Sequence, residues 1–92
     1  MEAMNANNLC PVCGYEMDQP AWNGLSASDE ICPSCGIQFG YDDFAGGDLG
    51  RRGQIYNAWR TDWIAKGMPW IGVGMPVPKN WNPQQQIRRV MA

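Results

Sequence analysis

The sequence contains no histidine, and its first fifty residues contain no lysine or arginine. Without histidine, the chain lacks the commonest general base and every catalytic triad that depends on one, so we expect no enzymatic activity. It also lacks a run of about 20 apolar residues, which a membrane span needs. Residues 1–8 have neither the basic nor the apolar part of a secretory signal. These absences predict a protein of the reducing cytoplasm that does not enter membranes.

The charge is divided between the two halves of the chain. Residues 1–50 carry eight acidic residues, whereas residues 51–92 carry all seven bases and a single acid, Asp62. The formal charges of the halves are therefore −8 and +6. Because the first half is so acidic, the chain favours basic partners over phosphate. Internal pairing between the two halves is the simplest explanation of the division.

The chain has four cysteines, arranged as two C-x2-C pairs with eighteen residues between the pairs. The run CPVCG at residues 10–14 recurs as CPSCG at residues 32–36. Proline presets φ for a tight turn, and glycine allows the sharp bend that follows. Two such turns at this separation predict one tetrathiolate metal site, with disulfides or a redox pair as the alternatives. The predicted ligands are Cys10, Cys13, Cys32 and Cys35.

Tetrahedral sulfur ligation suits either zinc or iron. The cysteine turns partly resemble those of rubredoxin, a one-iron electron carrier. However, the gap between the pairs is shorter here, and the basic second half has no counterpart in that family. We therefore expect one structural Zn²⁺ ion, with iron as the alternative. Four thiolates complete the shell and leave no open position for catalysis.

The pattern predicts a small metal-stabilised α+β fold in three parts. Residues 1–8 form a disordered lead, and residues 9–70 form a zinc-ribbon domain of rubredoxin-like knuckles and short strands. The knuckles pack on one amphipathic helix, over about 51–66. Residues 71–92 form a tail rich in proline and glycine that wraps the core. A short helix is expected near its end, over about 83–90.

Local signals bound the two predicted helices. Asp48 is a candidate N-cap for the first, and Gly67 stands where a left-handed C-cap belongs. Asn82 followed by proline is typical of the start of a second helix. The apolar stripe of the first helix is predicted from its spacing to contain Ile55, Trp59 and Trp63, with Tyr56 and Ile64 flanking them.

Three segments resemble small bacterial cysteine-rich proteins related to the CPCC type. They are CPVCGY at residues 10–15, ICPSCGIQFGYDD at residues 31–43, and the pattern R-x-x-W-I-x-x-G-x-P-W at residues 60–70. The resemblance covers about residues 9–70 and implies a bacterial zinc-ribbon module. Proteins of this kind are mostly uncharacterised, so the resemblance implies no mechanism.

We expect a zinc-stabilised protein-binding module, acting toward a basic protein partner as an adaptor or as an inhibitor, a class that includes the immunity type. Candidate partner-binding residues are Tyr41, Asp42, Asp43, Trp81, Arg88 and Arg89. The competing interpretation places the tryptophans in the core and lets the acids cap a helix or pair with Arg51 and Arg52. A nucleic-acid-binding zinc ribbon is the alternative function, opposed by the negative charge. Rubredoxin-like electron transfer is a third and weaker hypothesis.

Overall fold

The first predicted helix is present as α1, Leu49–Ala65, in the computed structural model, which describes residues 6–91. The Asp48 side chain caps its start, because Oδ1 accepts a hydrogen bond from the Arg51 N–H at 3.1 Å. At the other end Gly67 adopts a φ of +91°, a conformation that favours glycine. The capping residues therefore fix both ends within two residues of the prediction.

The second helix, α2, spans Pro83–Ile87 and is shorter than expected. The Asn82 side chain accepts from the Gln85 N–H at 3.1 Å, as its predicted N-cap role requires. The prediction that this helix runs to about residue 90 is wrong. After Ile87 the chain continues in tighter turns, in which the Val90 N–H donates to the carbonyl three residues earlier.

The short strands expected within residues 9–70 are present as one pair. β1, Trp22–Asn23, pairs antiparallel with β2, Ser26–Ala27, in a hairpin between the two cysteine pairs. Gly24, in the hairpin turn, has a φ of +62°. Near the cysteines, single bridges join Leu9 to Glu16 and Ile31 to Gln38.

Two short 3₁₀ helices complete the elements of the described chain. η1, Ala6–Asn8, falls in the lead that was expected to be disordered through residue 8. The Asn8 carbonyl accepts from the Met17 N–H at 2.9 Å, which ties this end of the lead to the domain. Residues 1–5, the rest of that predicted lead, lie outside the described residues. η2, Ala45–Gly47, precedes α1.

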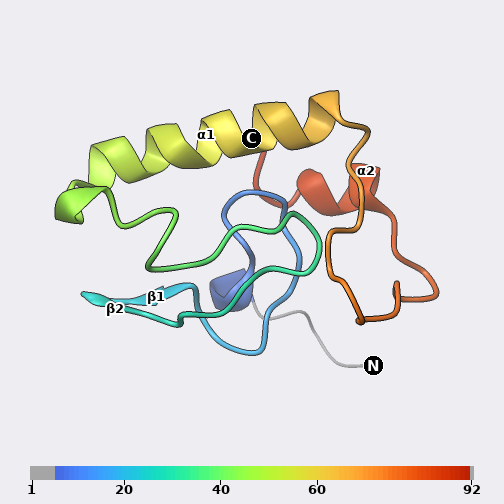
Figure 1. Cartoon of the computed structure of the whole chain (residues 1–92), viewed down its shortest axis with the longest axis horizontal. Coiled ribbons are helices and arrows are strands. Elements are labelled where there is room, and N and C mark those ends of the chain that lie inside the picture. Colours follow the sequence, from blue (N-terminus) through green and yellow to red (C-terminus); the bar gives the residue numbers. More distant parts are fainter. Residues whose placement is uncertain (1–5, 92) are drawn as a thin grey trace.

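The cysteine-bearing loops lie beneath α1, with the hairpin and α2 toward opposite ends of the molecule (Figure 1). Nine of the eleven buried hydrophobic residues come from residues 10–39, so this segment forms most of the core around its own cysteines. α1 adds Trp63 and α2 adds Ile87. The nine are Cys10, Val12, Cys13, Met17, Ala21, Cys32, Cys35, Ile37 and Phe39. In the described chain, no helix has the length and apolar character that crossing a membrane requires.

The inward face of α1 differs from the predicted stripe. Arg52 and Trp63 are buried, and Tyr56 and Trp59 pack against the core. These four positions follow a 4-3-4 spacing, which places them on one helix face. Ile55 is only half-buried and is not among the residues packed on the core. The prediction was right for the two tryptophans and for Tyr56, but it included Ile55 and the exposed Ile64 and left out Arg52.

Backbone carbonyls and an indole ring, beside a buried carboxylate, hold the arginine on that face. The side chain of Asp43 is fully buried. Its Oδ2 accepts from Trp22 Nε1 at 2.9 Å and from the Tyr56 hydroxyl at 2.6 Å, and its Oδ1 accepts from the Gly40 N–H at 2.6 Å. Arg52 stacks on the Trp22 ring at 3.6 Å and donates Nε to the Asp43 carbonyl at 2.8 Å. The network joins the hairpin, the loop before η2 and α1.

Burial and the hydrogen bond to Asp43 raise the pKa of Tyr56, so its hydroxyl remains a donor. We expect Tyr56→Phe to lower the free energy of unfolding of the metal-loaded protein by about 1.5–3 kcal/mol, because the buried carboxylate loses a donor. Urea denaturation measures the change. Tyr41→Phe is the matched control, since Tyr41 is 78% exposed. Equal effects of the two variants would contradict a role for the buried network.

Candidate metal centre

The two CPxCG runs fold into turns of matching geometry, the first cysteine turn (residues 10–15) and the second cysteine turn (residues 32–37). In each, the glycine donates its N–H to the carbonyl of the first cysteine, at 2.9 Å and 2.8 Å respectively. The φ of Gly14 is +83° and that of Gly36 is +85°. The sequence repeat is therefore a structural repeat, and each turn supplies two cysteines to the same place.

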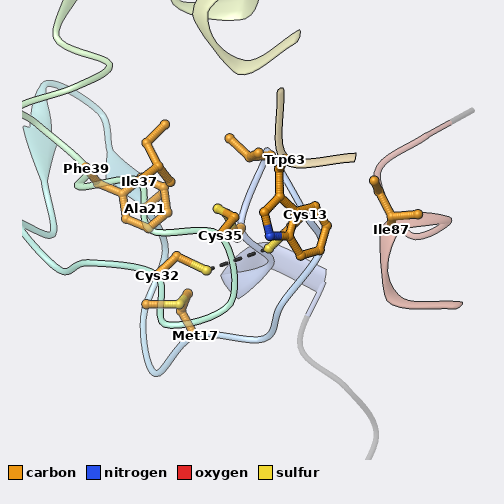
Figure 2. Packing of buried hydrophobic residues seen from close by; sticks show 11 residues of the cluster. Cys13, Met17, Ala21, Cys32, Cys35, Ile37, Phe39, Trp63 and Ile87 are labelled. Atoms are coloured by element: carbon orange, nitrogen blue, oxygen red, sulfur yellow. Dashed lines mark hydrogen bonds between the residues drawn. The ribbon is translucent and has the colours of Figure 1, made fainter. Parts of the chain in front are cut away.

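The four cysteine sulfurs converge. All four Sγ atoms lie within 4.8 Å of one another, with Cys10 and Cys35 3.8 Å apart and Cys13 and Cys32 3.6 Å apart. Figure 2 marks the second of these contacts. For a metal–sulfur bond of about 2.3 Å, the edge of a regular tetrahedron is about 3.8 Å. All four residues are buried free thiols. The cluster therefore has the donors, the spacing and the burial of a four-sulfur metal site.

The close approach of the sulfurs shifts the pKa values of the cysteine thiols in different directions. Burial raises the pKa of the Cys13 thiol, but hydrogen bonds from the other three sulfurs and from Ser34 outweigh it and bring the pKa below its ordinary value. Hydrogen bonds to Cys10 and Cys13 hold the pKa of Cys32 and Cys35 above theirs. A divalent ion binds thiolates, so it must displace the protons that this cluster holds.

Arg60 of α1 binds the first cysteine turn from outside. Its Nε donates to the Val12 carbonyl and its Nη2 to the Pro11 carbonyl, both at 2.7 Å. Both carbonyls belong to the two residues between the ligands of this turn. The planar guanidinium thus holds two successive peptide groups at once, which a lysine ammonium does not do.

Gln86 and Arg89, from α2 and the turn after it, bind the next two carbonyls of the same turn. Gln86 is buried, and its Nε2 donates to the Cys13 carbonyl at 3.1 Å and to the Ser34 hydroxyl oxygen at 3.0 Å. Arg89 donates Nη1 to the Gly14 carbonyl at 3.0 Å. One glutamine side chain therefore joins the two cysteine turns through the C-terminal helix.

The second cysteine turn is bound in the same manner by other donors. Trp59 Nε1 donates to the Cys35 carbonyl at 2.9 Å. The backbone N–H groups of Ile71 and Gly72 donate to the Pro33 carbonyl at 3.0 Å and 2.8 Å. α1 and the segment that follows it therefore contact both cysteine turns.

The glycines of the turns permit this close approach. A Cβ atom at Gly14 would collide with the carbonyl group of Gln86, and one at Gly36 would lie 3.0 Å from Cγ2 of Ile71. Both positions also have a positive φ, where a side chain is strained. Glycine is thus required twice, for the bend and for the contact with the second half of the chain.

The expected internal pairing of the two halves takes a different form. Three arginines of the basic half bind backbone carbonyls of the acidic half: Arg52, Arg60 and Arg89. Arg52 donates to the carbonyl of Asp43 rather than to its carboxylate, which neutral donors already satisfy. The ion pair between Asp62 and Lys66, at 2.8 Å, lies within the basic half. The halves are therefore joined by charge–dipole hydrogen bonds.

The three candidate partner-binding residues after the second cysteine turn have different environments. Tyr41 is largely exposed, as a partner-binding residue must be. The carboxylate of Asp42 accepts from the Gln38 N–H at 2.7 Å. Asp43 is fully buried, so its assignment to a partner-binding surface was wrong: its carboxylate is occupied inside the protein.

The candidate partner-binding residues near the C-terminus also have different environments. Trp81 packs against the core, meets Trp70 edge-to-face with ring centroids 5.2 Å apart, and donates Nε1 to Gln86 at 2.9 Å. Arg89 is engaged with the first cysteine turn, whereas the neighbouring Arg88 is exposed. Trp81 therefore agrees with the alternative interpretation, in which its indole packs against the core.

Sequence reasoning gave no role in the site to three residues: Ser34, Arg60 and Gln86. Ser34 lies between two ligands but has no motif of its own. Arg60 opens the third segment of the resemblance, which was the available signal. Gln86 lies in a run of glutamines at residues 84–86, which gives no indication that one of them is buried.

No protein-family model matches the chain, and comparisons with curated proteins and with solved structures gave no match either. The resemblance to CPCC-type proteins therefore stays a prediction. What is established is a buried four-cysteine cluster with metal-site geometry in a small α+β domain.

We expect elemental analysis of the purified protein to find about one zinc ion per chain and a colourless solution. Because binding releases thiol protons, the apparent affinity should fall at least about tenfold per pH unit as the pH is lowered from 7 to 5. Cys32→Ser should lose both the metal and the fold, while Ser26→Ala in β2 keeps both. A red protein with one iron per chain would instead favour electron transfer.

Proposed function

We propose that this chain is a protein-binding module held in shape by a structural zinc ion in knuckle-type cysteine turns. The observation that carries the proposal is the closed sulfur shell. Four buried cysteines would fill every position of a tetrahedral ion and leave none for substrate or water. Such an ion supplies folding energy to a domain whose regular elements are few and short. The proposal places the protein in the reducing cytoplasm, where thiols remain available to metal.

The support for protein binding is a group of exposed apolar side chains at the hairpin end. Leu25 at the hairpin tip is 99% exposed, Leu49 at the start of α1 is 73% exposed, and Phe44 between them in sequence is 56% exposed. With Trp22 they line a groove of about 460 Å³, here named the hairpin groove. Apolar side chains gathered in this way are typical of protein interaction sites.

The charge distribution supports a basic protein partner over nucleic acid. The acidic half attracts basic surfaces, and a tetrathiolate zinc site would add two negative charges to it. Three of the five arginines, Arg52, Arg60 and Arg89, already donate to carbonyls within the protein, which leaves fewer for phosphate. An adaptor or inhibitor is therefore the function that we favour, including the immunity type.

The hairpin groove can be tested by replacing its two most exposed leucines. We expect the double variant Leu25→Ser/Leu49→Ser to lose the protein that co-purifies with the wild type from its native cells, because the apolar contact area is removed. Quantitative mass spectrometry measures the recovery. Val73→Ser is the control, since Val73 is equally exposed but lies in the tail. Loss with the control alone, or with neither variant, would contradict the groove as the binding site.

The nucleic-acid alternative has a separate test. We expect no micromolar affinity of the wild type for a short labelled duplex or single strand at ~50 mM salt, where attraction to phosphate is strong. Fluorescence anisotropy measures the binding. Tight binding that weakens steeply with salt and is abolished by Arg51→Glu/Arg88→Glu would establish the alternative, since both side chains are exposed.

A further inference from the structure

The carbonyl groups of the first cysteine turn are bound at every position from residue 10 to residue 14. The Gly14 N–H binds the first, and side chains bind the other four. Those side chains belong to Arg60, Gln86 and Arg89, which lie between 48 and 75 residues further along the chain. The turn that carries two of the four cysteines is therefore held by the opposite half of the protein.

Holding a carbonyl fixes the peptide group to which it belongs. In a trans peptide unit the N–H points away from the C=O, so a donor on the oxygen sets the orientation of the whole unit. Arg60 fixes in this way the two peptide units between Pro11 and Cys13. Cys13 directly follows these units and Cys10 precedes them by one unit, so the spacing and direction of both cysteine side chains depend on that orientation.

Two of the three donor side chains are positively charged, whereas the proposed metal centre would be negatively charged. A divalent ion with four thiolates carries a net charge of −2, and a guanidinium group nearby stabilises it in a site that excludes water. Arg60 and Arg89 both bind carbonyls of the first cysteine turn, and Gln86 supplies a neutral donor between them. The arrangement combines orientation with charge compensation.

We propose that Arg60, Gln86 and Arg89 are positioning residues of the metal centre, which set its affinity and ligand geometry through the carbonyls of the first cysteine turn. This inference rests on the proposed zinc site. It also assigns a function to two arginines of the basic half of the chain: Arg60 and Arg89 hold the first cysteine turn. Docking of α2 and occupation of the metal site then favour each other, because the same contacts belong to both.

Arg52 provides an internal comparison. It lies on the same helix as Arg60, is buried, and also donates to two backbone carbonyls, those of Asp43 and Phe44. The loop that it holds contains no cysteine. Arg52→Gln therefore removes a comparable structural contact without touching a metal-binding turn. Arg88→Gln, at an exposed neighbour of Arg89, controls for the loss of one positive charge at that end.

The experiment measures zinc affinity by competition with a chromophoric chelator, using the full chain and its single variants. We expect Arg60→Gln to weaken zinc binding about 10–100-fold, which is the usual effect of removing a residue that orients the metal ligands by hydrogen bonding. Arg89→Gln should weaken it by a smaller factor, since one carbonyl loses its donor instead of two. Arg88→Gln should bind zinc with the affinity of the wild type. Arg52→Gln should bind zinc at least tenfold more tightly than Arg60→Gln does.

A second measurement separates positioning from general destabilisation. The Co²⁺-loaded protein has visible ligand-field bands that report the geometry of the four sulfurs. We expect Arg60→Gln to shift these bands and Arg52→Gln to leave them in place, even where urea denaturation shows equal losses of stability. Arg60→Lys keeps the positive charge but loses the planar pair of donors. It should therefore bind zinc more tightly than Arg60→Gln, while its cobalt spectrum stays shifted from that of the wild type.

Two different results would overturn these claims. If the wild type binds zinc, while Arg60→Gln and Arg52→Gln lose equal affinity and share the wild-type cobalt spectrum, the positioning role is wrong and the zinc centre stands. If the wild type itself fails to bind zinc stoichiometrically, the proposed zinc centre is wrong and the positioning role fails with it.

Discussion

Four buried sulfur atoms within 4.8 Å of one another are the constraint around which this chain is organised. The described chain has one helix longer than five residues and a hairpin of two-residue strands, so regular hydrogen bonding accounts for little of its order. The core is built mainly by the cysteine-bearing segment itself, and a chain of this size buries a smaller fraction of its surface than a large domain does. Whatever brings the sulfurs together therefore determines the rest of the fold.

A chain made largely of turns has many backbone carbonyls outside helices and sheets, and each needs a donor when it is buried. Here the second half of the chain supplies them. Arg60, Gln86 and Trp59 reach carbonyls of the two cysteine turns, and the backbone N–H groups after α1 reach another. Three of the seven bases, Arg52, Arg60 and Arg89, thus satisfy backbone carbonyls of the acidic half.

The hairpin end of the molecule is organised differently. There a single buried carboxylate, that of Asp43, gathers donors from the hairpin, the following loop and α1. Its neighbours Leu25, Phe44 and Leu49 remain exposed around the hairpin groove. The cysteine cluster thus lies beneath α1, and the hairpin end presents apolar side chains to solvent. A structural metal in that cluster would leave the hairpin end free for the partner that we propose.

The sequence by itself determined the features that depend on near neighbours: the two repeated CPxCG turns, the caps at Asp48 and Asn82, and the two inward tryptophans of α1. Each follows from φ preferences or from hydrogen bonds over three or four residues. The tertiary structure alone decided that Asp43 is buried and that Gln86 reaches the first cysteine turn, 73 residues away. It also replaced Ile55 by Arg52 on the inner face of α1. These outcomes depend on where distant carbonyls and carboxylates come to lie, and the spacing of residues along the chain does not encode that.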